Sequence, residues 1–239
     1  MNLRKYFEIG EGSVPIVLST PHGGYKRPKV IPDKQVGQNL VDINTYIIAK
    51  QIIKSIKNIS IYYILNKIHR SKIDLNRPPI SDQAFNQSSN MARNIHFLYH
   101  DQLRRFAQES VSKYGRTLII DLHGFTKPKK NYPDIILGHV FGNTLDLFQN
   151  SNEENCDRYW GCSQLHQELS KFFSLDDGLS ISKFNLGYSG GYITQQFYNV
   201  KQISAIQVEV AKHIRLDFEF SSKFVKSCVR AIINSVKSN

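Results

Sequence analysis

The chain has 239 residues, of which 41% are hydrophobic and 11% are aromatic, and 31 Lys and Arg residues face 20 Asp and Glu residues. This composition is typical of a globular protein and argues against a disordered chain, so a single domain spanning residues 1–239 is the simplest interpretation. The sequence lacks the ~20 uninterrupted apolar residues of a membrane span and the apolar run of a signal peptide. We therefore expect a soluble, cytoplasmic protein with no membrane partner.

The net charge of +11 makes nucleic acids and acidic substrates partners to consider. The basic residues are scattered rather than gathered in a block, which favours a solvated basic surface and argues against a nucleic acid partner. The oligomeric state stays open. Three cysteines, Cys156, Cys162 and Cys228, include no CxxC pair. They predict reduced thiols, and any metal would be bound through nitrogen and oxygen.

Short apolar, β-branched runs alternate with segments of helical periodicity along the chain. The predicted order is strand 14–19, helix 39–57, strand 59–65, helix 97–115, strands 117–122 and 134–138, helix 164–173, strand 203–210 and helix 221–237. Gly115 suits the C-terminal cap of its helix. This alternation predicts a three-layer α/β fold, in which helices cover both faces of a mostly parallel mixed sheet. The predicted loops are 23–38, 78–94, 124–133 and 174–199, and long loops in such a domain usually build a site.

Two histidines stand where predicted strands end. His22 in STPHGGY comes directly after the first strand, and His123 in IIDLHGF ends the third. Either one alone is more often a structural hydrogen-bonding residue than a metal ligand. Because the carboxyl ends of parallel strands meet at one ligand-binding edge of the sheet, the two side chains can meet there. A catalytic zinc site takes three His or carboxylate ligands, so a carboxylate must join them.

The candidates for this third ligand are Asp42 and Asp121. Asp42 lies near the start of the helix at 39–57, and a helix that follows a strand-end loop begins at the same edge of the sheet. Asp121 shares a pleat face with His123 and can act from outside the metal site by accepting a histidine N–H. We prefer Asp42 as the ligand, although a first-turn carboxylate is also favoured by the helix dipole alone.

Further polar residues lie in segments 69–79 and 203–210. Arg70 and Arg77 flank a short IDL run, and arginine presents a planar fork that matches a carboxylate and stabilises a developing oxyanion. Glu209 lies inside a predicted strand, where a buried carboxylate costs free energy unless it is used or paired. Beside a metal site it would serve as a general base. The glycine-rich segment 188–197 resembles either a hinge or a turn into an edge strand.

In this order the segments resemble the N-formylglutamate amidohydrolase family, within the wider zinc carboxypeptidase and aspartoacylase-like group. The resemblance runs from about residue 13 to about residue 215. It rests on five motifs: PHGG at 21–24, Arg70 followed by DLNRPP at 74–79, DLHG at 121–124, GGYIT at 190–194 and IQVE at 206–209. Five motifs in the family's order make a chance resemblance improbable.

The resemblance implies that His22, Asp42 and His123 hold one zinc ion. It also implies that Glu209 is the general base and that Arg70 polarises the scissile carbonyl. The substrate-binding residues that it implies are Asn76, Arg77, Gly191, Tyr192 and Thr194. The chain departs from zinc carboxypeptidases three residues after the first histidine, where Tyr25 replaces a glutamate ligand. The family's aspartate on the following helix matches Asp42.

The activity implied is zinc-dependent hydrolysis of the amide bond in an N-acylated, formyl-type acidic amino acid such as N-formylglutamate. Candidates for a second carboxylate clamp are Lys127, Lys129, Arg93 and the GGYIT loop, which the sequence does not rank. Two alternatives remain. One is a carboxypeptidase-like hydrolase acting on the ends of peptides or cell-wall fragments, and the other is a non-catalytic basic binding protein on the same fold.

Overall fold

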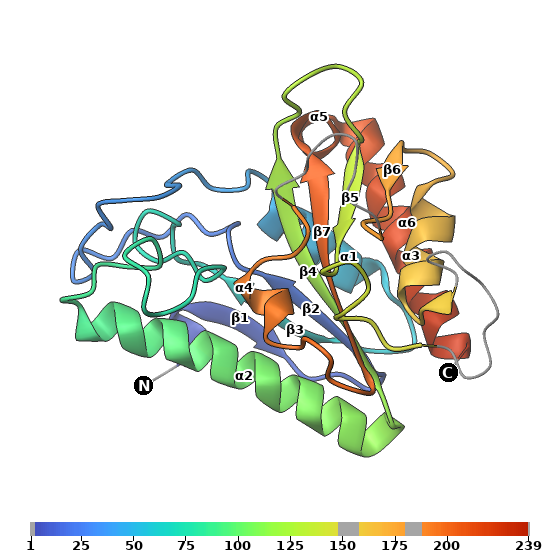
Figure 1. The fold of residues 1–239 in the computed structure, drawn as a ribbon, viewed down its shortest axis with the longest axis horizontal. Coiled ribbons are helices and arrows are strands. Elements are labelled where there is room, and N and C mark those ends of the chain that lie inside the picture. The colour runs from blue at the N-terminus through green and yellow to red at the C-terminus, as the bar shows by residue number, and fades with distance from the viewer. Residues whose placement is uncertain (1–2, 148–157, 180–187, 239) are drawn as a thin grey trace.

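A seven-stranded mixed sheet runs through the computed structural model, which describes residues 3–147, 158–179 and 188–238 (Figure 1). In spatial order the strands are β1 (Phe7–Gly10), β3 (Tyr62–Asn66), β2 (Ile16–Thr20), β4 (Thr117–Phe125), β7 (Ile203–Ala211), β5 (Ile135–Gly138) and β6 (Leu175–Asp176). Only β1–β3 and β5–β7 are antiparallel among the pairings of these described strands. The mostly parallel mixed sheet predicted from the sequence is confirmed.

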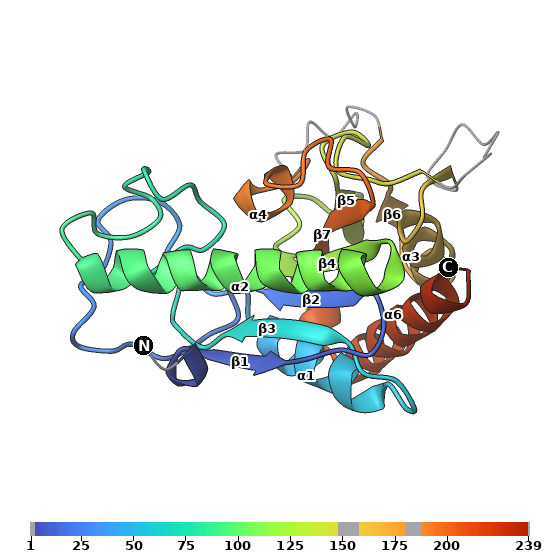
Figure 2. The same cartoon turned by 90° about the horizontal axis from the view of Figure 1, so that it is seen from below.

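The central strands are continuously apolar because both faces of the sheet are covered. All five residues of β2 are buried, and its successive side chains enter opposite cores. Ile16 and Leu18 pack into the core beneath α1 (Thr45–Ser55), α3 (Cys162–Leu169) and α6 (Phe218–Lys237), whereas Val17 packs into the core beneath α2 (Asn90–Tyr114). Figure 2 shows α2 on the opposite side of the sheet from α1 and α6, so the three-layer arrangement is confirmed.

Capping residues define both ends of helix α2. The Ser89 hydroxyl accepts a hydrogen bond from the Ala92 backbone N–H at 3.2 Å, and Gly115 ends the helix with φ 78°. Three shorter helices complete the described elements, namely η1 (Leu3–Lys5), α4 (Tyr192–Gln195) and α5 (Lys212–Leu216). No helix in the described part of the chain is both long and apolar enough to cross a membrane.

All five predicted strands are present, and the differences lie at element ends and in loops. Helix α1 begins at Thr45 rather than at residue 39, because Asn44 adopts a left-handed conformation with φ 66°. Asp42 therefore lies in the segment before α1 and not in its first turn. Helix α2 begins seven residues before the predicted start at 97, which shortens the predicted loop 78–94.

Short elements also occupy positions that the sequence left without structure. Strand β1 was not predicted, and β6 and α4 lie within the predicted loop 174–199, of which residues 180–187 are outside the described residues. Cys228 is a buried free thiol as predicted. Cys162 is disulfide-bonded, so the prediction of reduced thiols is wrong at this position.

Candidate metal centre and active site

The carboxyl edge of the central strands gathers the chemically interesting side chains. His22 follows the end of β2 by two residues, while His123 and Glu209 lie near the ends of β4 and β7 and are directly opposite each other in the parallel register. The Asp42 backbone N–H donates to the His22 carbonyl at 3.0 Å and brings the segment before α1 to the same place. The strand-end positions thus meet at one edge, as the sequence predicted.

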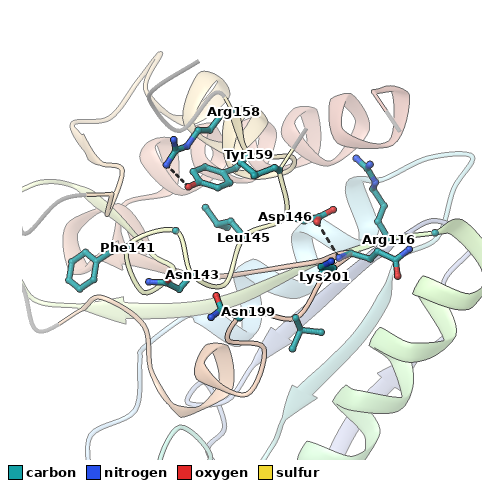
Figure 3. A pocket seen from close by; sticks show the side chains of 14 residues that line it. Arg116, Phe141, Asn143, Leu145, Asp146, Arg158, Tyr159, Asn199 and Lys201 are labelled. Atoms are coloured by element: carbon teal, nitrogen blue, oxygen red, sulfur yellow. Dashed lines mark hydrogen bonds between the residues drawn. The ribbon is translucent and has the colours of Figure 1, made fainter. Parts of the chain in front are cut away.

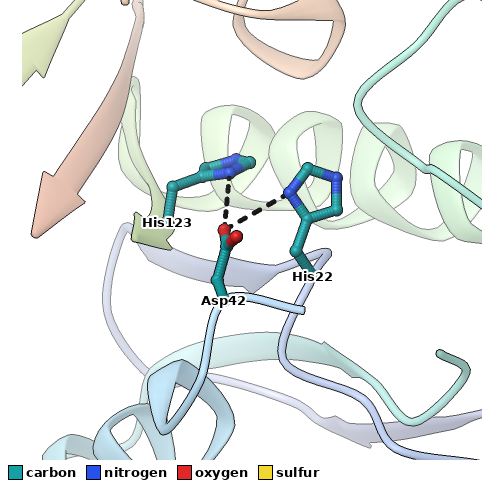
Figure 4. A group of neighbouring side chains, drawn as sticks. All are labelled: His22, Asp42 and His123. Atoms are coloured by element: carbon teal, nitrogen blue, oxygen red, sulfur yellow. Dashed lines mark ion pairs between the residues drawn. The ribbon is translucent and has the colours of Figure 1, made fainter. Parts of the chain in front are cut away.

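His22, Asp42 and His123 form a compact buried group (Figure 4). Both histidine Nδ1 atoms lie 3.4 Å from Oδ2 of Asp42, and one ligand atom from each residue lies within 4.8 Å of the others. The two imidazole rings converge on the carboxylate with their centroids 4.8 Å apart. Two histidines and one carboxylate are a ligand set typical of catalytic zinc, with a further position left for water.

Two further aspartates orient the histidine rings. Nε2 of His22 lies 2.7 Å from Oδ1 of Asp74, and Nε2 of His123 lies 2.8 Å from Oδ2 of Asp121. Because an ionised carboxylate only accepts, each Nε2 donates, and each Nδ1 keeps its lone pair for a metal when the ring is neutral. Nδ1 of His22 is buried and has no hydrogen-bond partner among the described residues. The donor set and this unsatisfied nitrogen fit a metal ion.

The electrostatics of this group also favour a cation. Burial raises the pKa of Asp42, but the adjacent imidazoles of His123 and His22 outweigh it, and the net pKa is lowered. Burial lowers the pKa of His123, yet the neighbouring Asp121 and Asp42 raise it well above the ordinary value. The negative environment between these two carboxylates thus favours a proton on His123. Metal binding would have to displace that proton.

Glu209 is held by one oxygen only. Its Oε1 accepts a hydrogen bond from Nε2 of Gln207 at 2.8 Å, while its Oε2 is buried without a hydrogen-bond partner among the described residues. Burial raises its pKa; Asp42 adds to this effect and His123 opposes it. A buried carboxylate with a raised pKa and one free oxygen suits a general acid–base role.

Gln207 also fixes the segment around Gly191. Its Oε1 accepts from the Gly191 backbone N–H at 2.7 Å and from Nδ2 of Asn76 at 3.1 Å. Asn76 in turn accepts from the Ile193 backbone N–H at 2.9 Å through Oδ1. The amide groups of Gln207 and Asn76 therefore tie the DLNRPP and GGYIT segments to the strand that carries Glu209.

The five residues assigned to substrate binding occupy different places. Asn76, Arg77 and Gly191 line the cavity over the metal group. Thr194 is buried and donates to the Gly191 carbonyl at 3.0 Å, and the Tyr192 ring lies 5.1 Å from that of His100 in α2. Neither of the last two is among the residues that line this cavity, and in the structure they support the wall behind it.

Only some of the cationic residues predicted to contact the substrate lie at this cavity. Nε of Arg70 donates to Oδ2 of Asp74 at 2.9 Å, and its Nη1 lies 3.5 Å from Oδ1 of Asp42. Among the other candidates, Lys127 pairs with Asp134 at 2.6 Å and Arg93 bonds to the backbone of residue 87, and neither lines the cavity. Arg70 and Arg77 are the predicted arginines that the structure brings to the site.

The cavity has a volume of about 650 Å³, within the range of small-molecule sites. Four cationic or titratable residues in its wall were not predicted: Arg27, His69, Lys212 and Arg215. Asp74 was also missed as the partner of His22 and Arg70. Position relative to recognised motifs was the available signal, because Asp74 begins the DLNRPP motif and the other four residues lie near PHGG, Arg70 or Glu209 in the sequence.

A larger cavity of about 790 Å³ lies at the opposite edge of the sheet, where β4 and β7 begin (Figure 3). Arg116, Asp146, Tyr159 and Lys201 are among its lining residues, and none of the residues of the metal group is. Size alone therefore does not identify the active site. The convergence of ligand atoms and an unsatisfied carboxylate oxygen favours the smaller cavity.

Comparison with known proteins agrees with the resemblance seen in the sequence. Residues 82–215 match the family model described as N-formylglutamate amidohydrolase. No curated protein matches the chain.

Solved structures share the fold at low sequence identity. The N-formylglutamate amidohydrolase from Ralstonia eutropha JMP134 has a TM-score of 0.69 at 15% identity, with 98% of each chain covered. Gene product Atu2144 from Agrobacterium tumefaciens has a TM-score of 0.66 at 12% identity, covering 98% of this chain and 94% of that one. A bacteriophage poly-gamma-glutamate hydrolase has a TM-score of 0.50 at 9% identity, covering 98% of this chain and 90% of that one. Since the family model spans more than half of the 239 residues, this chain belongs to the N-formylglutamate amidohydrolase family of amide-bond hydrolases.

Proposed function

We propose that this protein is a zinc-dependent hydrolase that cleaves the amide bond of an N-acylated acidic amino acid such as N-formylglutamate. The observation that carries the proposal is the meeting of His22, Asp42 and His123 with the free Oε2 of Glu209 at one cavity. Membership of the N-formylglutamate amidohydrolase family supports this substrate class. The fold shared with the Ralstonia eutropha N-formylglutamate amidohydrolase is consistent with it.

In this proposal Nδ1 of His22, Nδ1 of His123 and the Asp42 carboxylate hold the metal ion. When bound, zinc supplies Lewis-acid chemistry and lowers the pKa of water towards ~7. Asp74 and Asp121 keep both Nε2 atoms protonated and so direct both Nδ1 lone pairs into the site. The burial of all three ligands keeps competing bulk water away from them.

Glu209 moves the proton. Its free Oε2 takes a proton from the attacking water and then delivers it to the departing amine nitrogen, while Gln207 holds Oε1 in place. The raised pKa makes protonated Glu209 a competent acid for the second step. Two of the three nitrogens of Arg70 are engaged with Asp74 and Asp42, so Nη2 is the nitrogen that would polarise the scissile carbonyl.

Cations on the cavity wall provide carboxylate recognition. The Arg77 guanidinium forms only a 3.5 Å hydrogen bond with the Asn76 carbonyl among the described residues, which leaves most of its fork for a substrate carboxylate. Arg27 and Lys212 also line the cavity and would attract a second carboxylate. This arrangement favours a dicarboxylic amino acid over an apolar one.

The test combines metal analysis with a substrate panel of N-formyl-glutamate, N-acetyl-glutamate, N-formyl-leucine and a γ-glutamyl dipeptide. We expect one zinc ion per chain and release of glutamate from an N-acyl-glutamate. Glu209→Gln should keep zinc and lose turnover by about 10²-fold to 10⁴-fold, whereas Glu219→Gln on the exposed start of α6 should match the parent.

Three outcomes would count against this assignment. Absence of both zinc and turnover would refute the proposed function, and full activity of Glu209→Gln would refute the role of the base. Cleavage of the γ-glutamyl dipeptide alone would replace N-acyl amino acids with peptide ends as the substrate class.

A further inference from the structure

One buried guanidinium in α5 bonds to three backbone carbonyls from different parts of the chain. Nε of Arg215 donates to the Val210 carbonyl at 2.9 Å, and Nη2 donates to the Phe125 carbonyl at 3.1 Å. Nη1 donates to the Ile43 carbonyl. The side chain of Asn44 closes the arrangement by donating to the Arg215 carbonyl at 2.9 Å. Arg215 therefore links the ends of β4 and β7 with the segment before α1.

Each of these three segments carries one proposed active-site residue. The bonded carbonyls belong to the residue after Glu209, the residue after Asp42 and the second residue after His123. A buried backbone carbonyl needs a hydrogen-bond donor, and the Ile43 carbonyl lies in a loop, outside any strand ladder. One side chain satisfies all three here.

The three nitrogens of the buried Arg215 guanidinium make this arrangement specific to arginine. Arg215 is only 5% exposed, and it forms no salt bridge with any described residue. A buried cation without a contacting anion costs free energy, which the three carbonyl bonds and the nearby carboxylates Asp42 and Glu209 offset. Lysine has one nitrogen and could not reach three carbonyls in fixed, separate directions.

Gly124 provides the space in which the guanidinium lies. A Cβ atom at this position would be 2.4 Å from Cζ of Arg215, well inside van der Waals contact. The Gly124 backbone N–H donates to Oδ2 of Asp42 at 3.0 Å. The glycine after His123 thus leaves room for the guanidinium while its own N–H bonds to the candidate ligand.

We propose that Arg215 is a positioning residue that holds Asp42, His123 and Glu209 in their relative places through the backbone. The inference rests on the proposed function, because that function defines why these three residues must be aligned. Its contacts are made by protein atoms alone, so they can be measured without metal or substrate.

The experiment compares amide hydrogen exchange of the metal-free parent and Arg215→Lys, followed by kinetics of the zinc-loaded proteins. We expect faster exchange in peptides covering 40–45, 122–126 and 208–212, with α2 unchanged. We also expect kcat to fall by about 10-fold to 100-fold with little change in KM, as for other residues that orient catalytic groups. Arg116→Lys, which changes a partly buried arginine over Trp160 at the opposite edge, should leave all of these unchanged.

Gly124→Ala offers a second route to the same test, since it keeps Arg215 but displaces its guanidinium. It should reproduce the exchange pattern of Arg215→Lys. Exchange that rises throughout the protein, α2 included, would make Arg215 a general stabilising residue and overturn the proposal, as would unchanged exchange in the three segments. If the local pattern appears in a protein that binds no zinc and cleaves nothing, the positioning role stands and the proposed function fails.

Discussion

Gln207 and Glu209 lie two residues apart on β7, and one hydrogen bond of 2.8 Å joins Nε2 of the first to Oε1 of the second. The Gly191 N–H and Nδ2 of Asn76 both donate to Oε1 of Gln207, and these two bonds fix the orientation of its amide. The nitrogen must then face Glu209. This relationship leaves Oε2 as the oxygen available for the proposed proton transfer.

Gln207→Leu should therefore lower kcat rather than raise KM. We expect a loss of about 10-fold to 100-fold, since the carboxylate becomes free to rotate while Gln207 itself bonds to none of the cations on the cavity wall. Steady-state kinetics on the best N-acyl-glutamate measure both constants. Gln108→Leu on the exposed side of α2 serves as the matched control, and a rise in KM without loss of kcat would contradict the positioning of the base.

Gly191→Ala should destabilise the protein through contact with Asn76 rather than through backbone strain. The backbone at Gly191 has φ −96°, which alanine adopts freely, but a Cβ would lie 2.1 Å from Nδ2 of Asn76. Overpacking of this kind typically costs about 1–3 kcal/mol. Urea unfolding measures the change, and Asn76→Ser in the same chain should relieve part of it. Additive effects of the two substitutions would show that the contact is not the cause.

Zinc should stabilise the folded protein through the His22, Asp42 and His123 group. At a free zinc concentration 100 times Kd the gain is about 2.7 kcal/mol, if the unfolded chain does not bind the metal. Thermal unfolding with and without zinc measures this gain. His123→Ala should abolish the zinc-dependent shift, and His213→Ala, at an exposed histidine in α5, should retain it. A zinc shift that survives His123→Ala would place the metal elsewhere.

The pH dependence of stability should include a contribution from His96 in α2. Burial lowers its pKa to about 4, although its hydrogen bond to the Arg77 carbonyl opposes that shift. Between pH 4 and the ordinary value of 6.5 the unfolded chain binds a proton that the folded chain does not, so stability falls as the pH falls through this range. The limiting slope for one such histidine is about 1.4 kcal/mol per pH unit.

His96→Gln isolates this contribution, since glutamine can still donate to the Arg77 carbonyl but does not titrate. The difference in free energy of unfolding between variant and parent, measured in urea from about pH 4 to about pH 7, should shift in favour of the variant as the pH falls. A difference independent of pH would show that His96 titrates normally in the folded protein.

Much of the sheet and the placement of its strand-end residues could be predicted from local sequence patterns. Short β-branched runs identified β2, β3, β4, β5 and β7, and helical periodicity identified the four longer helices. In a parallel sheet this local information already implies that His22 and His123 share one edge, because the strand direction sets the edge. The order of five motifs then pointed to the amidohydrolase family.

The side-chain contacts within the site required the tertiary structure. Asn76 and Gln207 are separated by 131 positions and His22 and Asp74 by 52, and no periodic pattern connects such pairs. The position of Asp42 before α1 depended on the left-handed Asn44, which the apolar periodicity of 39–57 did not reveal.

The alternation of strands and helices along the chain makes the central strands parallel. The sequence was therefore sufficient to place the two strand-end histidines at one edge of the sheet. The partners of Glu209, the free nitrogens of the arginines and the three carbonyl bonds of Arg215 depend on distances between atoms far apart in the chain. Hydrogen bonds form only over about 3 Å with near-linear geometry. Only the packed structure establishes which polar groups meet within that range.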